Sequence, residues 1–375
     1  MKSKKKRGEQ IMYIGIMSGT SLDGIDMVAA SFSDQSVTLH HQAEYPFPET
    51  LKEKLIALSQ GAPVTLEEFG TIDHFLGKTY AETVNRFLAE NDLKAHDITA
   101  IGCHGQTVFH KPTGPMPFTM QLGDANIIAA LTGITTVADF RRKDMALGGQ
   151  GAPLVPAFHQ FLFGTDASTK VVLNIGGIAN ISVLTPNQSI VGYDTGPGNM
   201  LMDSWISEHK GKPYDKDGAW ASIGTVNQAL LNQMLSDGYF AQPAPKSTGR
   251  ELFHRGWLEA QLNVFNKPVN PEDVQATLLA FTVQSIANDV LRFGQGELLV
   301  CGGGARNQAL MAALKTALPN WQVMATDEKG VNGDSLEALA FAWLAHQALE
   351  GKPGNLPDVT GASRSCRLGA IYYPD

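Results

Sequence analysis

The chain has 375 residues and a mass of 40.3 kDa, with a formal net charge of −8 and a pI near 5.7. Hydrophobic residues make up 43% and charged residues 18%, which supplies a large core and excludes a disordered or collagen-like chain. The mild acidity argues against a general binder of nucleic acids or membrane surfaces, which would carry a basic face. At about 100–200 residues per domain, the length indicates two domains or one large one.

Cysteine usage and the N-terminal segment indicate the compartment. The three cysteines are Cys103, Cys301 and Cys366. They form no CxxC pair and no even-numbered set, which is typical of buried thiols in a reducing compartment. Residues 1–7 are basic like the start of a signal peptide, but Asp23 and Asp26 end the apolar run that follows. No stretch reaches 18 apolar residues, so we expect a soluble, cytoplasmic protein without a membrane span.

The predicted elements, taken in chain order, alternate strands with helices. Residues 12–32 form an apolar run, a turn of Gly, Ser and Asp, and a second apolar run, which predicts a β-hairpin. Apolar residues at helical spacing from Leu66 to Leu88 predict a long helix with a buried stripe. Residues 171–184 repeat the hairpin layout in a shorter form. Because a hairpin begins each half of the chain, we expect a duplicated α/β domain.

Three further helices are expected in the second half. Asn270, followed by Pro and two acidic residues, caps a helix that runs to about Phe293. Residues 308–318 form another, and a third begins after Asp334-Ser335 and ends at Gly351. Short strands that end in Gly-rich turns are expected at residues 98–105 and 298–304.

The common nucleotide and hydrolase motifs are absent from the sequence. It contains no GxxxxGK[ST], no GxGxxG after a strand, no HRD or DFG, no HExxH and no GxSxG. The ten histidines show no metal-ligand spacing. What the chain offers instead is a set of Gly-rich turns that carry carboxylates.

The turn of the first hairpin is one candidate phosphate site. Gly19 allows close approach of the backbone, and Thr20 and Ser21 add hydroxyl donors, so the turn is able to wrap an anion. Asp23 and Asp26 would repel a phosphate directly, so either a Mg²⁺ ion lies between, held through water, or both carboxylates face elsewhere. The alternative is a tight hairpin whose aspartates bond their own backbone.

A second candidate lies around Asp194. This residue follows Ile190-Val191, so we expect it at the end of a short strand, before a Gly-Pro-Gly turn and a helix start near Asn199. A helix start offers unpaired N–H groups and a positive dipole, which favour phosphate, and Asp194 beside it is placed to act as a base. The alternative is an aspartate that only caps the helix.

A third candidate is the run of three glycines at residues 302–304, at the end of a predicted strand. Consecutive glycines leave a flat backbone against which a base or ribose can lie. The alternative is a glycine loop without a ligand.

The three motifs, in this order, resemble the superfamily of sugar kinases, heat-shock chaperones and actin. Within it, residues 15–26 resemble the signature of the anhydro-N-acetylmuramic acid kinase family. Further matching segments are residues 102–107, 139–144, 148–153, 174–180 and 192–199. The resemblance covers about residues 12–373, which is nearly the whole chain.

This resemblance implies an α/β, two-lobed actin-like ATPase fold with duplicated ribonuclease-H-like domains and a nucleotide cleft between them. The N-terminal lobe is expected at residues 11–140 with the first phosphate hairpin. The C-terminal lobe is expected at 141–375 with the second phosphate turn and the adenosine loop, its last helix free to pack back on the first lobe. The resemblance also implies ATP, Mg²⁺, a homodimer and a role in peptidoglycan recycling in a bacterial cytoplasm.

The implied reaction opens 1,6-anhydro-N-acetylmuramic acid with water and phosphorylates O6, giving N-acetylmuramic acid 6-phosphate and ADP. Because O6 is tied to carbon 1 in this sugar, no free hydroxyl exists there, and a base must activate the water. We assign that base to Asp194. Two other classes stay open: a free-standing ATPase or nucleotide-gated binding module, and an ordinary hexosamine kinase acting on an open ring.

The residues implied in binding fall into four groups. At the first turn they are Gly19, Thr20, Ser21, Leu22, Asp23, Gly24, Ile25 and Asp26, of which Asp23 and Asp26 hold the metal through water. At the second turn they are Gly177, Asn180, Gly196, Gly198 and Asn199, and at the third Gly302, Gly303 and Gly304. For the sugar they are His104, Gln106, Arg141, Arg142 and Glu337.

Each sugar residue has an alternative reading. Either Arg141 or Arg142 binds the lactyl carboxylate, and the other forms a surface ion pair. His104 and Gln106 either bind the acetamido group or ring hydroxyls or are satisfied within their loop. Glu337 either reaches the sugar or its water or only compensates a helix dipole.

Overall fold

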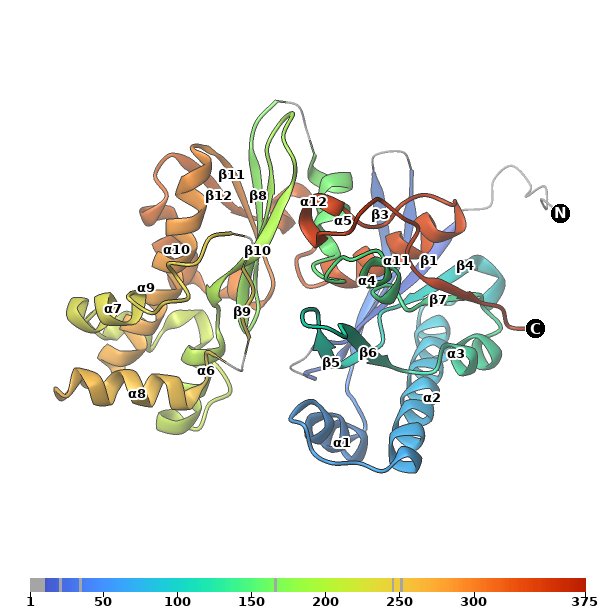
Figure 1. Cartoon of the computed structure of the whole chain (residues 1–375), viewed down its shortest axis with the longest axis horizontal. Helices are drawn as coiled ribbons and strands as arrows, with labels where there is room; N and C mark the ends of the chain where they lie inside the picture. Colours follow the sequence, from blue (N-terminus) through green and yellow to red (C-terminus); the bar gives the residue numbers. More distant parts are fainter. Residues whose placement is uncertain (1–10, 20–21, 34–35, 165–166, 245, 250–251) are drawn as a thin grey trace. The chain divides into compact units, whose positions relative to one another are not determined.

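The computed structural model divides the chain into two compact units. It describes all residues except 1–10, 20–21, 34–35, 165–166, 245 and 250–251. The first unit combines Met1–Leu162 with Ser335–Asp375, and the second is Phe163–Asp334 (Figure 1). The division therefore lies after Leu162 rather than at residue 140, because Arg141 and Asp144 bond to residues of the first unit. The segment from Ser335 onward, which contains the last long helix, belongs to the first unit, an arrangement that the prediction left open for that helix.

A mixed sheet forms the centre of the first unit, in the order β13-β7-β4-β1-β2-β3. The strands β1, β2 and β3 are antiparallel neighbours, β4 runs parallel to β1, and β7 runs parallel to β4. A separate hairpin, β5–β6, lies outside this sheet. The bounds are β1 Met12–Met17, β2 Ile25–Phe32, β3 Val37–Tyr45, β4 Ile98–Cys103, β5 Gln106–Lys111, β6 Phe118–Leu122, β7 Thr136–Ala138 and β13 Ala370–Tyr372.

Helices cover both faces of this sheet. The long helix α2 begins at a capping box in which Thr65 and Glu68 bond each other's backbone N–H, and its apolar stripe joins the core beneath β1 and β2. The helix α11 packs on β1, β2 and β4. The helices of this unit are α1 Glu49–Ser59, α2 Leu66–Glu90, α3 Ala125–Thr132, α4 Arg142–Ala146, α5 Val155–Phe163, α11 Leu336–Leu349 and α12 Pro357–Thr360, with the 3-10 turn Ala95–Asp97.

Two glycines let α11 approach the sheet closely. A Cβ atom added to Gly15 would lie 1.9 Å from the Ala338 carbonyl oxygen, and one added to Gly102 would lie 2.0 Å from that of Phe341. Real Cβ atoms never come this close to a backbone oxygen. Only glycine therefore fits β1 and β4 beneath this helix.

We expect Gly102→Ala to lower the free energy of unfolding by about 1–3 kcal/mol or more, because the added methyl group forces α11 off the sheet. Gly70 is the matched control, since it lies in α2 and a Cβ added there would have no other atom within 4 Å. Gly70→Ala should raise the free energy of unfolding by about 0.5–1 kcal/mol, as expected for an exposed helical glycine. Urea denaturation of both variants checks the pair, and equal effects would contradict the close-packing explanation.

The second unit repeats the topology of the first. Its sheet has the order β10-β9-β8-β11-β12, with three antiparallel strands followed by two parallel ones. This shared order confirms the predicted duplicated α/β fold. The elements are β8 Lys170–Ile175, β9 Ile178–Leu184, β10 Val191–Pro197, β11 Gly296–Cys301, β12 Trp321–Ala325, α6 Met200–Lys210, α7 Gln228–Leu235, α8 Arg255–Phe265, α9 Pro271–Val290 and α10 Gln308–Ala317. The 3-10 turns are Lys216–Gly218, Ala221–Ile223, Leu291–Phe293, Gly303–Arg306 and Thr326–Lys329.

Most predicted elements are confirmed. The two predicted hairpins are β1–β2 and β8–β9, and the predicted helices are α2, α9, α10 and α11. Asn270 occupies the cap of α9 as predicted, but its side chain donates to Asp273 Oδ2 at 3.1 Å instead of bonding the helix backbone. Cys103 and Cys301 are buried thiols, whereas Cys366 is partly exposed. Within the described part of the chain, the helices are all too short or too polar to cross a membrane.

Candidate active site

Asp194 lies in β10 next to a β-bulge. Its register partner on β9 is Asn180, and the register shifts between Asp194 and Gly196, which has a φ of +148°. The sequence predicts that the strand ends near Asp194, but β10 continues to Pro197. The prediction is wrong because the bulge, rather than a strand end, breaks the regular pairing here. A bulge bends the strand and redirects the side chains beside it.

A segment distant in sequence contacts Asp194. Its carboxylate Oδ2 accepts hydrogen bonds from Ser247 Oγ at 2.9 Å and from the Thr248 N–H at 3.0 Å. The Tyr239 hydroxyl donates to the Asp194 carbonyl at 2.6 Å. Sequence analysis missed all three residues, because nothing in their local pattern links them to a strand 45 or more positions away.

Three glycine turns meet at one end of the second sheet. The Gly198 and Asn199 N–H groups donate to the carbonyls of Gly177 and Gly176, each at 2.8 Å. A Cβ on Gly198 would lie 2.4 Å from the Gly176 carbonyl oxygen, so the two backbones pass too closely for any side chain. Asn199 caps α6, and the first turn of a helix presents N–H groups that favour an anion.

The triple glycine joins the same place. A Cβ on Gly302 would lie 2.3 Å from Asn174 Oδ1, and one on Gly304 would lie 2.4 Å from Ile175 Cγ2, so this loop lies against the end of β8. Gly303 faces the Asn199 amide, since its added Cβ would lie 3.7 Å from Nδ2. The structure thus brings Gly176-Gly177, Gly198-Asn199 and the loop of residues 302–304 together at one place, where backbone groups lie close to one another.

Hydrogen bonds from side chains of the same unit hold the turn of the first hairpin. Ser18 Oγ bonds the Tyr80 hydroxyl and the Gln106 side-chain oxygen, each at 2.7 Å. The Gln106 amide donates to the Gly19 carbonyl at 3.3 Å. The structure therefore gives Gln106 a role in shaping the turn, and this does not favour the predicted sugar contact. Thr20 and Ser21 lie outside the described residues.

The other residues of this turn differ in what they expose. The side chains of Leu22 and Ile25 are buried in the core, so only their backbone groups are able to face a ligand. Gly24 lies against Glu44, whose Oε1 would be 2.4 Å from an added Cβ. Asp23 is exposed, and Asp26 is partly buried in β2.

The donor set for a divalent cation is small. Among the described residues, no group of three or more His, Cys, Asp or Glu side chains is arranged to hold a metal. Asp23 and Asp26 therefore do not belong to an all-protein cage. Asp23, before β2, and Asp26, within it, supply carboxylate oxygens, which are the kind of ligand that Mg²⁺ prefers in proteins.

His104, Arg141 and Glu337 come together in the first unit. The Arg141 guanidinium donates to His104 Nε2 through Nε at 3.0 Å and to the Gly151 carbonyl at 2.8 Å. Burial and the Arg141 charge lower the pKa of His104 well below its usual range, so the ring is neutral. Burial raises the pKa of Glu337, and Arg141 opposes this shift. Burial lowers the pKa of Arg141 to about 10, against the pull of Glu337 and Asp144.

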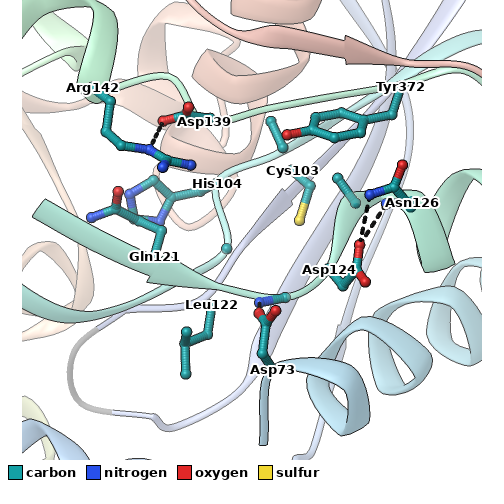
Figure 2. A pocket seen from close by; sticks show the side chains of 14 residues that line it. Asp73, Cys103, His104, Gln121, Leu122, Asp124, Asn126, Asp139, Arg142 and Tyr372 are labelled. Atoms are coloured by element: carbon teal, nitrogen blue, oxygen red, sulfur yellow. Dashed lines mark hydrogen bonds and ion pairs between the residues drawn. The ribbon is translucent and has the colours of Figure 1, made fainter. Parts of the chain in front are cut away.

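Arg142 points elsewhere. Its side chain is 66% exposed and forms an ion pair with Asp139 at 2.8 Å. It lines a cavity of about 170 Å³ that also includes His104 (Figure 2). In Figure 2 the Arg142–Asp139 pair lies on one side of this cavity, and Asp124 with Asn126 lies on the other.

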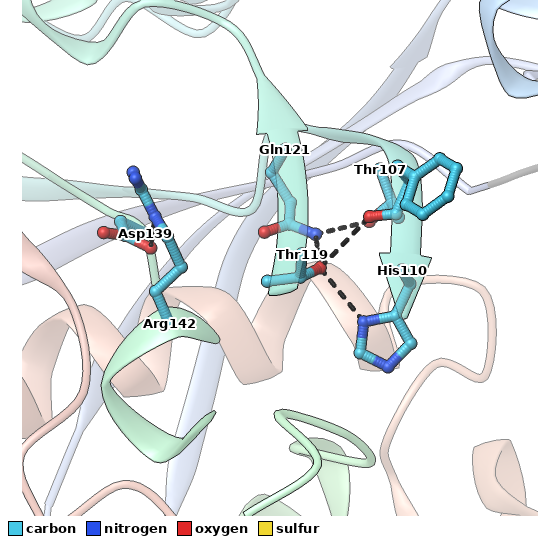
Figure 3. Close-up of polar contacts among 7 residues, drawn as sticks. Thr107, His110, Thr119, Gln121, Asp139 and Arg142 are labelled. Carbon is cyan, nitrogen blue, oxygen red and sulfur yellow. Dashed lines mark hydrogen bonds and ion pairs between the residues drawn. The ribbon is translucent and has the colours of Figure 1, made fainter. Parts of the chain in front are cut away.

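The β5–β6 hairpin supplies polar groups next to this cavity. Gln121 Nε2 donates to the hydroxyls of Thr107 at 3.2 Å and Thr119 at 2.7 Å, and Thr119 also bonds His110 Nδ1 at 3.0 Å (Figure 3). Burial and the Arg141 charge lower the pKa of His110 to about 4. Sequence analysis missed this group, although the alternation of Thr119 and Gln121 with apolar residues was a usable strand signal.

Two units of one topology, each with a glycine-bearing turn and a carboxylate beside it, define the duplicated α/β ATPase fold of sugar kinases. A family model described as anhydro-N-acetylmuramic acid kinase matches residues 11–374. The chain belongs to this family.

Relatives align over almost the full length. An anhydro-N-acetylmuramic acid kinase of Vibrio cholerae is 58% identical over 370 residues, covering 98% of this chain and 100% of that protein. One of Aliivibrio fischeri is 59% identical over 363 residues, covering 96% and 98%. Among solved structures, a ROK family glucokinase from Streptomyces griseus in complex with glucose and AMPPNP aligns with a TM-score of 0.39 and 12% identity, covering 90% of this chain and 99% of that one.

Proposed function

We propose that this chain is an ATP-dependent kinase that opens 1,6-anhydro-N-acetylmuramic acid with water and phosphorylates its O6. The products are N-acetylmuramic acid 6-phosphate and ADP. The match of residues 11–374 to one kinase family, with relatives of the same name at 58% identity, carries this proposal. A role in peptidoglycan recycling in the bacterial cytoplasm, and a homodimer, are parts of the same proposal.

The substrate sets the chemistry, because its O6 is bonded to carbon 1. A water oxygen attacks carbon 1, the bond from carbon 1 to O6 breaks, and O6 forms a bond to the γ-phosphorus as the bond to the ADP oxygen breaks. The proton that the water loses goes to the Asp194 carboxylate. A hydrogen-bonded carboxylate in a fixed orientation is suited to this step, and Asp194 receives such bonds from Ser247 and Thr248.

Positioning and charge neutralisation carry the rest of phosphoryl transfer. The backbone cradle around Gly177, Gly198 and the 302–304 loop is our candidate for the nucleotide, with Asn180, Gly196 and Asn199 beside it. The turn from Gly19 to Asp26 is our candidate for the terminal phosphates. A Mg²⁺ ion held through water by Asp23 and Asp26 would neutralise phosphate charge there.

The sugar residues divide by exposure. The Arg141 guanidinium is occupied by His104 and Gly151, so we assign Arg141, His104 and Glu337 to a fixed polar wall that meets ring hydroxyls. Arg142 is exposed, and the carboxylate of a ligand is able to replace Asp139 as the ion-pair partner of the Arg142 guanidinium. We therefore assign Arg142 to the lactyl carboxylate, which is the anionic part of the sugar.

The test uses the protein with Mg-ATP and 1,6-anhydro-N-acetylmuramic acid in ¹⁸O-labelled water. Mass spectrometry of the early product should show a 6-phosphosugar with one ¹⁸O at the anomeric position. Because that hydroxyl exchanges by mutarotation, unlabelled product incubated in the same water is the control. Release of ADP without a phosphosugar would favour the ATPase or binding-module alternative. Phosphorylation of an open-ring hexosamine in place of the anhydro sugar would favour an ordinary hexosamine kinase.

A further inference from the structure

We propose that the segment Lys246–Thr248, here called the base strap, positions Asp194 for catalysis and is itself anchored by a buried ion pair. This inference rests on the proposed function, in which Asp194 is the base that activates water. Ser247 and Lys246 are positioning residues in this proposal, because they act on the reaction only through Asp194.

The base strap runs beside β10 and fixes the Asp194 backbone. The Asp194 N–H donates to the Lys246 carbonyl at 3.0 Å. On the other side of the same residue, the Tyr239 hydroxyl donates to the Asp194 carbonyl at 2.6 Å. The bulge after Asp194 interrupts the regular pairing of β10 with β9. These two hydrogen bonds therefore hold the Asp194 backbone at a point where the sheet holds it less firmly.

The base strap also orients the carboxylate. Ser247 Oγ and the Thr248 N–H both donate to the same oxygen, Oδ2, at 2.9 and 3.0 Å. Two donors on one oxygen fix the rotation of the carboxylate plane, since either bond is lost when the side chain turns. Hydrogen bonds to a carboxylate also favour its charged form, which is the form that accepts a proton from water.

A buried ion pair anchors the base strap. Lys246 Nζ lies 3.6 Å from Asp289 Oδ2, and the two side chains are 2% and 3% exposed. Asp289 belongs to α9, in the core of the same unit, and also faces Arg292 at 3.5 Å. The Lys246 ammonium lies 4.8 Å from the centre of the Tyr239 ring, whose hydroxyl bonds Asp194. One cluster therefore holds the strap and both sides of the Asp194 backbone.

A buried ion pair is seldom more stable than well-packed apolar side chains of the same volume. The free energy needed to remove two charges from water is about as large as the free energy gained from their attraction. The value of the ion pair lies in defining a single geometry. An aliphatic residue at position 246 would pack against Tyr239 without fixing the position of the base strap along β10. The lysine ammonium must face Asp289, which fixes that position, and we take this as the reason that a lysine is buried here.

The test compares six proteins with Mg-ATP and the anhydro sugar: wild type, Ser247→Ala, Ser247→Thr, Asp194→Asn, the control Ser236→Ala and the double variant Asp194→Asn/Ser247→Ala. Single-turnover rates of phosphosugar formation report the chemical step, and KM values report binding. We expect Ser247→Ala to slow the single turnover by about 10- to 150-fold, the effect of losing one hydrogen bond to a charged group, with both KM values near those of wild type. Ser247→Thr keeps the hydroxyl and should restore the rate, and Ser236→Ala serves as a control for an exposed serine outside the site.

The double variant Asp194→Asn/Ser247→Ala separates positioning from a general structural effect. If Ser247 acts through Asp194, the double variant is no slower than Asp194→Asn alone. Additive losses would overturn the proposal, because Ser247 would then act independently of the base. Thermal unfolding of each variant checks that Ser247→Ala, at an exposed position, keeps the fold.

The remaining outcomes distinguish this inference from the proposed function. If Asp194→Asn loses activity and Ser247→Ala equals wild type, the base strap is overturned and the assignment of the base stands. If Asp194→Asn keeps the wild-type rate, Asp194 is not the base, and the proposal that the base strap positions a catalytic base fails with it. If Ser247→Ala raises the KM for ATP or the sugar without slowing the single turnover, Ser247 binds a substrate and the proposal is wrong.

Discussion

Replacing Asp194 with asparagine is expected to slow formation of the phosphosugar by about 10²–10⁴-fold, the usual contribution of a general base. Asparagine keeps the shape of the side chain, and its carbonyl oxygen is able to accept the bonds from Ser247 and Thr248. It cannot take a proton from water. The loss should therefore lie in the chemical step, and nucleotide affinity measured by calorimetry should change by no more than about threefold.

Asp217→Asn is the matched control for this experiment. Asp217 is an exposed aspartate of the same unit at a φ of +57°, a conformation that asparagine tolerates. The control variant should retain the wild-type rate. A rate for Asp194→Asn above about a tenth of the wild-type rate would contradict the role of Asp194 as base, since general-base catalysis contributes more than this.

The sequence predicts the local architecture well where the signal is local. The hairpin that contains the first turn, the hairpin that contains Gly176-Gly177, the helix α2 and the start of α9 at Asn270 all follow from short-range patterns that the structure confirms. The duplication also follows from the sequence, because a hairpin begins each half of the chain, and the two sheets share the corresponding strand order.

The sequence fails where the determining contact joins distant segments. Whether Arg141 or Arg142 turns inward depends on His104 and Gly151, which no pattern within the Arg-Arg pair reveals. Gln106 looks like a ligand-binding amide in sequence, but Ser18 and the backbone of the first turn occupy it. Polar residues after a strand show where in the chain a site lies. Which of them contact a ligand and which only support their neighbours depends on tertiary contacts that the local sequence does not reveal.

The place where the chain divides into two units has a related cause. The family resemblance implies a boundary near residue 140, whereas Asp144 holds its segment to the first unit through Asn355 and Thr360. These partners lie 211 and 216 positions later in the chain. A chain that leaves a unit and returns to it at its end leaves no local mark of the return.

The same contacts predict a large stability effect for Asp144→Ala. Asp144 is 0% exposed, and its carboxylate accepts from the Asn355 amide at 2.7 Å, the Thr360 hydroxyl at 2.8 Å and the Gly151 N–H at 2.8 Å. Alanine leaves these donors buried without an acceptor. We expect a loss of about 3–5 kcal/mol in the free energy of unfolding, measured by urea denaturation.

A graded series tests this explanation more sharply than alanine alone. In Asp144→Asn, the remaining oxygen is able to keep the bonds to Asn355 and Thr360, and only the Gly151 N–H meets a second donor, so the loss should be smaller than in Asp144→Ala. Asp358→Ala, at an exposed position in α12, is the control and should change stability by less than about 0.5 kcal/mol. Equal losses for Asn and Ala would contradict the bonding scheme.

The series also connects stability to the proposed sugar-binding residue Arg141. Asp144 lies in α4, the helix that begins directly after Arg141, and the Asp144 charge opposes the effect of burial on the Arg141 pKa. The Gly151 carbonyl accepts a hydrogen bond from the Arg141 guanidinium, and the Gly151 N–H donates to the Asp144 carboxylate. The backbone of Gly151 therefore links the two side chains. We therefore expect Asp144→Asn to raise the KM for the anhydro sugar more than the KM for ATP. Equal changes in the two KM values would mean that Asp144 supports the fold of the first unit without setting the position of Arg141.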